Sequence, residues 1–163
     1  MIIERELIVN ILKKLEENGT PFYPVSRLAK DVNGDCKDPT HGHEPDGISG
    51  LTNEMVNHLL HLEDMNCITN VDGNCGWGYV PGSNKSNFEV IILAEEWDFP
   101  HCYGATSGQA IIRINANGRQ LLSVLLDDDI EDGEKKRALI SMETATNLFG
   151  RLIGGVLQGA MSV

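Results

Sequence analysis

The sequence predicts an α+β fold, in which helices surround a small antiparallel sheet. In the first part of the chain, apolar residues recur at the three- and four-residue spacing of amphipathic helices. Two short strand candidates follow, FEVIILA at 88–94 and AIIRI at 110–114, and the helical spacing then returns. Helices and strands grouped in this way, rather than in strict alternation, are typical of α+β proteins.

The composition is that of a folded protein with a strong acidic excess. The 163 residues include 13 Lys and Arg against 24 Asp and Glu, which gives a formal net charge of −11. Such a charge argues against a protein that coats nucleic acid or an anionic membrane. The sequence shows neither the pattern of a signal peptide nor a membrane-spanning apolar run. We therefore expect a cytoplasmic protein with reduced cysteines and no membrane association.

The first three helices are predicted from their apolar faces and their end signals. The first is stopped by Asn18-Gly19, and its apolar face is formed by Ile3, Leu7, Ile8, Ile11, Leu12 and Leu15. The second runs from about Pro24 to Val32 and is followed by a polar loop at about 33–50. The third spans Thr52 to Met65, with Thr52 as its N-cap, and Asn66 stands where glycine usually ends a helix.

Strands and further helices are expected after the third helix. The segment Ile68 to Val80 contains Asp-Gly and is predicted to form a hairpin, or wing. Asn115 is expected to cap a fourth helix, whose apolar face is formed by Leu121, Leu122 and Leu125. The acidic stretch Asp127 to Glu134 is predicted as a break before a last helix of roughly Ser141 to Ala160.

This order of elements is that of a winged helix-turn-helix domain with a small antiparallel sheet and a C-terminal helical extension. We expect the winged-helix domain to cover residues 1–126, with loop insertions at about 33–50 and 81–109. Residues 127–163 are expected to form an acidic linker and a C-terminal packing or dimerisation helix.

Four segments resemble an uncharacterised winged-helix family that is common in bacteriophages and prophages. ERELIVNILKKLEENG is similar to its opening helix, and LTNEMVNHLLHLEDMNCI to its helix of the type E-x-V-x-x-H-L-x-x-L. The family also has a strand that leads into a helix start of the type L-T-x-x-G-x-x-x-L and then an acidic patch. This pattern is similar to the segment AIIRINANGRQLLSVLLDDDI. SMETATNLFGRLIGGVLQG is similar to its C-terminal helix.

The resemblance implies a winged-helix fold and a phage or prophage origin, and hence the cytoplasm of a bacterial host cell. It assigns no activity and no site residue. Asn66 replaces the usual glycine of the family, and Arg119 stands where the family commonly has histidine. The loop at about 33–50 and the stretch 81–109 are longer than the family pattern.

Charge on the third helix and the wing decides between two functions. A winged helix that binds DNA needs Lys or Arg on these elements, to contact phosphates and guanine edges. The interval Ile48 to Asn84 has neither. The candidate partner-binding or recognition residues are Asn53, Glu54, Asn57, His58, His61, Glu63 and Asp64.

We therefore expect a non-enzymatic protein that binds another protein through this acidic face, by nucleic-acid mimicry or by inhibition of a host factor. The alternative is a dimeric, sequence-specific DNA-binding transcription regulator. Its cations would come from another surface, such as Arg27, Lys30 and Lys37 or the run Lys135 to Arg137.

Two further patterns concern metal binding and dimerisation. The side chains of a zinc site are present in Cys36, His41 and His43, and a fourth ligand could come from His58 or His61. A metal-stabilised module is therefore a third hypothesis for the function of this protein. A solvated polar loop is its alternative, and no other cofactor is expected.

The last helix carries small residues at four-residue spacing that permit close helix approach. This helix is predicted to pack within the chain or to form a homodimer. Its apolar stripe consists of Phe149, Leu152, Ile153, Val156 and Leu157.

Overall fold

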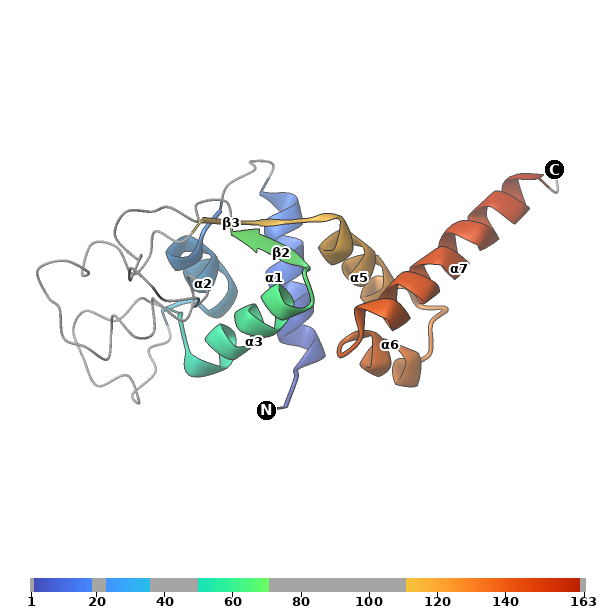
Figure 1. The fold of residues 1–163 in the computed structure, drawn as a ribbon. Coiled ribbons are helices and arrows are strands. Elements are labelled where there is room, and N and C mark those ends of the chain that lie inside the picture. The colour runs from blue at the N-terminus through green and yellow to red at the C-terminus, as the bar shows by residue number, and fades with distance from the viewer. Residues whose placement is uncertain (1, 19–22, 36–49, 71–110, 162–163) are drawn as a thin grey trace, which may run out of the picture.

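The computed structural model describes residues 2–18, 23–35, 50–70 and 111–161, and Figure 1 shows their arrangement. This part of the protein is mostly helical with one small antiparallel sheet, as an α+β prediction requires. The elements are α1 Arg5–Glu17, β1 Tyr23–Pro24, α2 Val25–Asn33, α3 Asn53–Asp64, β2 Ile68–Asn70, β3 Ile111–Ile114, α5 Ala116–Leu126, α6 Asp132–Ala138 and α7 Met142–Met161. The predicted strand at 88–94 and most of the predicted wing lie outside the described residues.

The sheet has three antiparallel strands in the order β1-β3-β2. The central strand β3 pairs Ile112 with Tyr23 on one side and Ile114 with Ile68 on the other. Ile112 and Ile114 are buried while Arg113 between them is exposed, which is the alternation of a strand with one face on the core. The strand predicted at 110–114 is therefore confirmed. The strand that begins at Ile68 pairs with this distant segment.

Helix α1 lies at the centre of the molecule, behind α3 and beside α5 in Figure 1. It contacts α2, α3, α5 and β3. The buried side chains Ile8, Ile11, Leu12 and Leu15 supply these contacts. Fully burying an aliphatic side chain stabilises a fold by about 1.5–3 kcal/mol, so the apolar face of α1 is a main contributor to the core.

The ends of α3 are set by the residues that the sequence indicates. The Thr52 hydroxyl accepts a hydrogen bond from the Met55 backbone N–H at 3.1 Å, which caps the first turn. At the other end Asn66 has a φ of 54°, in the left-handed region. Asparagine tolerates this conformation better than most residues. The Cys67 N–H then donates to the Leu62 carbonyl at 2.8 Å, and the chain enters β2.

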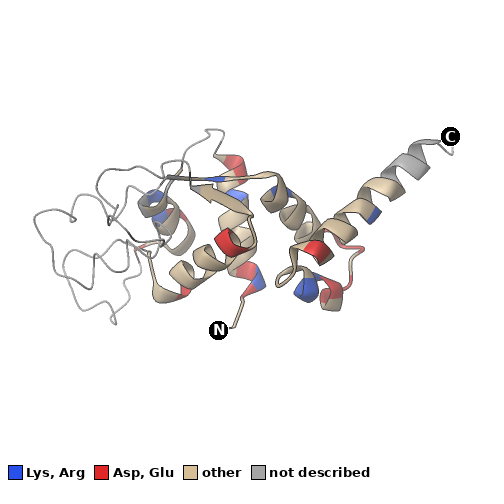
Figure 2. Cartoon of the chain, in the orientation of Figure 1, with Lys and Arg blue, Asp and Glu red and all other residues tan. Residues whose placement is uncertain are grey.

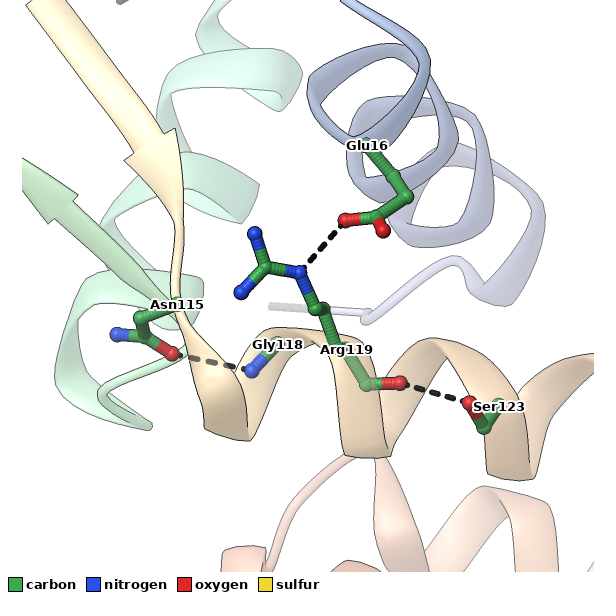
Figure 3. Close-up of polar contacts among 5 residues, drawn as sticks. All are labelled: Glu16, Asn115, Gly118, Arg119 and Ser123. Atoms are coloured by element: carbon green, nitrogen blue, oxygen red, sulfur yellow. Dashed lines mark hydrogen bonds and ion pairs between the residues drawn. The ribbon is translucent and has the colours of Figure 1, made fainter. Parts of the chain in front are cut away.

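Helix α5 starts at a close junction with the sheet, shown in Figure 3. The Asn115 side chain accepts a hydrogen bond from the Gly118 N–H at 3.1 Å, so the predicted N-cap is confirmed. A Cβ atom on Gly118 would lie only 2.2 Å from the Cys67 carbonyl oxygen. Arg119 Nε donates to Glu16 Oε2 at 2.9 Å and ties α5 to α1 on the surface. Glycine is thus needed where α5 crosses the start of β2.

The acidic stretch that the sequence predicts as a break does separate two helices at residues 127–131, and helix α6 then begins at Asp132. Asp132 and Glu134 lie in its first turn, and the run Lys135 to Arg137 lies in its last turn. This order complements the helix dipole, with negative charge at the N-terminus and positive charge at the C-terminus. Lys135 and Ala138 are buried, and Ala138 belongs to the hydrophobic core. The predicted break is therefore confirmed for residues 127–131 and wrong for 132–134, where the order of the charges favours a helix.

Helix α7 packs on α5 and α6 at its start and then continues beyond them (Figure 1). Ala145 and Leu148 are buried, and Arg151 Nη1 donates to Glu134 Oε1 at 2.9 Å. No helix among the described residues is long and apolar enough to cross a membrane.

Candidate functional site

Helix α3 carries the residues that the sequence predicts for partner binding, and the fold divides them into two groups. Met55, Leu59 and Leu62 are buried and fix the inner face of the helix. On the outer face Asn53, Glu54, Asn57 and Asp64 are exposed, and Glu63 is half-buried. We call Asn53, Glu54, Asn57 and Asp64 the outer face of α3. These four predicted residues share a solvent-facing surface.

His58 does not belong to this surface. Its side chain is only 1% exposed. The Glu4 backbone N–H donates to His58 Nε2 at 2.8 Å, and His58 Nδ1 lies 2.7 Å from the Glu54 carbonyl oxygen. Because Nε2 accepts from an N–H, the proton of the neutral ring is on Nδ1 and donates to that carbonyl. Both nitrogens are occupied within the chain, which corrects the prediction that His58 contacts a partner or a metal.

His61 is also engaged within the chain. Its Nε2 donates to the carbonyl oxygen of Leu139 at 2.6 Å, in the turn between α6 and α7. The side chain is half-buried. The prediction that His61 contacts a partner is therefore corrected to a structural contact between α3 and the C-terminal helices. Spacing alone does not separate a histidine that faces a neighbouring segment from one that faces solvent.

The outer face of α3 is acidic, and the described parts of α3 and β2 contain no Lys or Arg. Among the described residues, the cations nearest to α3 along the chain are on α2 and have acidic partners. Arg27 Nε lies 3.7 Å from Asp31 Oδ2, and Lys30 Nζ lies 3.6 Å from Asp35 Oδ1. Figure 2 shows red but no blue segments on α3. This surface can accept hydrogen bonds and attract cations, and its asparagine amides can also donate.

Tyr23 on β1 forms a polar cluster with α2 that the sequence analysis missed. Its hydroxyl donates a hydrogen bond to Asp31, and the Arg27 guanidinium lies 5.6 Å from the centre of its ring. Burial, and then the hydrogen bond to Asp31, raise the pKa of Tyr23 to about 12. An aromatic residue before a proline gives no signal for such a cluster, which depends on the pairing of β1 with β3.

The described residues contain no cluster of three His, Cys, Asp or Glu side chains that could hold a metal ion. The predicted zinc ligands Cys36, His41 and His43 lie outside the described residues. Cys67 is within the described part and is buried, and burial raises the pKa of its thiol to about 12. A thiol in this state is a poor nucleophile, because the reactive form is the thiolate.

The predicted dimerisation stripe on α7 is divided between the core and the surface. Phe149 and Leu152 are half-buried against the core of their own chain. Ile153 is 44% exposed. The side chains of Val156 and Leu157 lie outside the described residues. A Cβ atom on Gly150 or Gly154 would contact nothing within 4 Å among the described residues, so the close helix approach expected of these glycines is not made there.

Comparison of the chain with protein-family models, with curated proteins and with solved structures found no match.

Proposed function

We propose that this protein is a non-enzymatic, winged-helix-type protein that binds a basic protein surface with the outer face of α3. Two observations support the winged helix. The elements follow the order helix, strand, helix, helix, strand, strand, and the sheet has β3 between β1 and β2. The resemblance of four sequence segments to a phage and prophage family supports an origin in a mobile element that acts in the bacterial cytoplasm.

The observation that carries the function is the charge of the outer face of α3. A recognition helix that enters the major groove approaches two phosphate backbones, and carboxylates there are repelled. Here Glu54 and Asp64 are exposed, and both histidines that were candidates for base contacts are bonded within the chain. The same carboxylates favour association with a basic surface, because complementary charge raises the rate and the specificity of docking. Occupation of a nucleic-acid-binding groove in a host factor is the form of action that fits this chemistry.

The test compares the wild-type protein with a Glu54→Lys, Asp64→Lys double variant. An Asp128→Lys variant serves as the matched control, since Asp128 is an exposed carboxylate in the loop between α5 and α6 and does not belong to the outer face of α3. Each protein is immobilised and exposed to a bacterial host extract, and a basic partner captured by the wild type is then purified. We expect calorimetry to show at least about tenfold weaker binding of that partner to the double variant, or about 1.4 kcal/mol, and unchanged binding to the control.

DNA binding is the competing function and is measured in the same series. Fluorescence anisotropy with labelled duplexes from the neighbouring genomic region, at low salt, is expected to show no binding at micromolar protein. Sequence-specific binding that weakens steeply as salt rises would establish the regulator instead. Retention of the basic partner by the double variant would exclude the outer face of α3 as the binding surface.

A further inference from the structure

The two ring nitrogens of buried His58 have opposite hydrogen-bonding roles. Nε2 accepts from the Glu4 N–H at 2.8 Å, and Nδ1 donates to the Glu54 carbonyl at 2.7 Å. Only a neutral imidazole can accept with one nitrogen and donate with the other, because an imidazolium carries a proton on both. The hydrogen bond that joins α3 to the start of α1 therefore requires an uncharged ring.

The position of the ring at the N-terminus of α1 also disfavours a positive charge. Glu4 is the N-cap residue of α1, and its side chain makes no capping hydrogen bond. The N–H groups at a helix N-terminus together carry a partial charge of about +0.5. An imidazolium at His58 would lie beside these groups with only 1% of its side chain exposed to water. Burial of a charge without a charged partner is costly.

The charged residues on the elements around His58 are not bonded to its ring. Helix α3 packs on α1 and β2, and β2 has no charged residue. Glu54 on α3 and Glu4 before α1 have exposed side chains, while Arg5 pairs with Asp132 of α6 at 2.7 Å. Both ring nitrogens are bonded to backbone groups, so no carboxylate neutralises an imidazolium in the folded state.

We call residues 2–4 the N-terminal segment, and the bond to His58 is its hydrogen-bonded attachment to α3. The N–H groups of Ile2 and Ile3 donate no hydrogen bond to another described residue. Ile2 is 85% exposed, and Ile3 is half-buried against the core. In Figure 1 this segment lies at the edge of the molecule, before the first turn of α1. Segments with few buried contacts open at a lower free energy than the whole fold.

We propose that His58 makes the attachment of the N-terminal segment to α3 dependent on pH. As the pH falls, Nε2 takes a proton from the solvent, Nδ1 keeps its own, and the Glu4 N–H loses its acceptor. Release of the segment then gives the charged ring access to water. Histidine changes its charge between pH 8 and pH 5, so the segment is attached at neutral pH and released on acidification. This inference does not depend on the proposed function.

His61, one turn further along α3, is the internal comparison. Its Nε2 donates to the Leu139 carbonyl at 2.6 Å. A protonated ring keeps this N–H and continues to donate. Acidification is therefore expected to detach the N-terminal segment and to leave the contact between α3 and the turn before α7 in place.

Amide exchange with solvent, measured by NMR at pH 7.5 and pH 5.0 and corrected for the intrinsic rates, tests the release. In the wild type we expect the Glu4 N–H to be at least about tenfold less protected at pH 5.0, because it has lost its acceptor. The Leu12 N–H, in the buried part of α1, is expected to keep its protection. A titration of the His58 ring signals in the same samples is expected to have its midpoint at the pH where the Glu4 N–H opens.

Two variants assign the effect to one ring. His58→Gln places an uncharged amide, whose oxygen can accept from the Glu4 N–H, so protection should be the same at both pH values. His61→Gln is the matched control and should respond as the wild type does.

Three results would overturn the proposal. The first is equal protection of the Glu4 N–H at both pH values in the wild type. The second is a pH response that persists in a folded His58→Gln variant or, if that variant does not fold, a wild-type ring midpoint that differs from the midpoint of Glu4 opening. The third is a loss of protection at Leu12 together with Glu4, which would mean that the whole fold opens rather than the N-terminal segment.

Discussion

Replacing Gly118 by alanine tests the closest contact between helix α5 and the sheet. The added Cβ atom would lie 2.2 Å from the Cys67 carbonyl oxygen and 2.7 Å from Ile114 Cγ1. The first of these is a backbone atom that no change of rotamer moves away. Helix α5 must therefore shift away from β2 to make room for one methyl group.

The expected cost follows from the interactions that this shift disturbs. Overpacking a tight site costs about 1–3 kcal/mol. The shift also weakens the hydrogen bond from the Asn115 N–H to the Cys67 carbonyl, 3.2 Å long, which contributes about 1 kcal/mol. Loss of the Asn115 cap on the Gly118 N–H adds about 1 kcal/mol. Alanine regains up to about 1 kcal/mol of helix propensity, so we expect a net destabilisation of about 2–4 kcal/mol.

Urea unfolding monitored by circular dichroism measures this free energy. Gly133→Ala in α6 and Gly150→Ala in α7 are matched controls, since a Cβ atom at either position contacts nothing within 4 Å. Both are expected to stabilise the protein by about 0.5–1 kcal/mol, because only helix propensity changes. If Gly118→Ala were as stable as these controls, the close approach of α5 to β2 would be wrong.

Further predictions concern other buried polar groups. The pKa of Tyr23 is raised from 10.0 to about 12, so this group contributes stability below pH 10 that is lost as the pH rises toward 12. The difference in melting temperature between the wild type and Tyr23→Phe should therefore shrink from pH 10 to pH 12. A constant difference would contradict the raised pKa. Cys67 should resist a thiol-reactive disulfide reagent at pH 8 until urea unfolds the protein, because burial raises the pKa of its thiol to about 12; rapid labelling of Cys67, located by mass spectrometry in the native protein, would show that it is accessible. His58→Ala should lower the free energy of unfolding by about 1–3 kcal/mol, since it leaves the Glu4 N–H without its acceptor, whereas exposed Asn57→Ala should change it by no more than about 0.5 kcal/mol.

The sequence predicts helix ends and the apolar faces of helices well, because both depend on residues that are close together along the chain. Thr52, Asn66 and Asn115 act where their side-chain chemistry indicates, because a cap or a left-handed residue involves contacts within one turn of the chain. The burial of Leu121, Leu122 and Leu125 follows in the same way from helical spacing. Helix α6 is the exception, because the acidic break that the sequence predicts up to Glu134 ends at residue 131, and the charges that follow are ordered along the dipole of a helix.

The candidate site depends on which segments meet in space, and the spacing of residues does not carry that information. Asn57 and His58 are adjacent polar residues of one helix, and the sequence places both on its partner-binding face. One is exposed and the other is buried, because the start of α1 lies against α3 on one side only. The contact of His61 with Leu139 likewise requires α6 and α7 to pack beside α3.

Sequence patterns alone predict the helices of the described chain other than α6, the strand at 110–114 and the acidic character of the outer face of α3. These features arise from local periodicity, end signals and composition. The pairing of β2 with β3, and the hydrogen bonds of His58 and His61 to backbone groups of distant segments, follow only from the folded structure. Each of these depends on contacts between distant segments, whose free energy comes from burial and hydrogen bonding that form only when the whole core assembles.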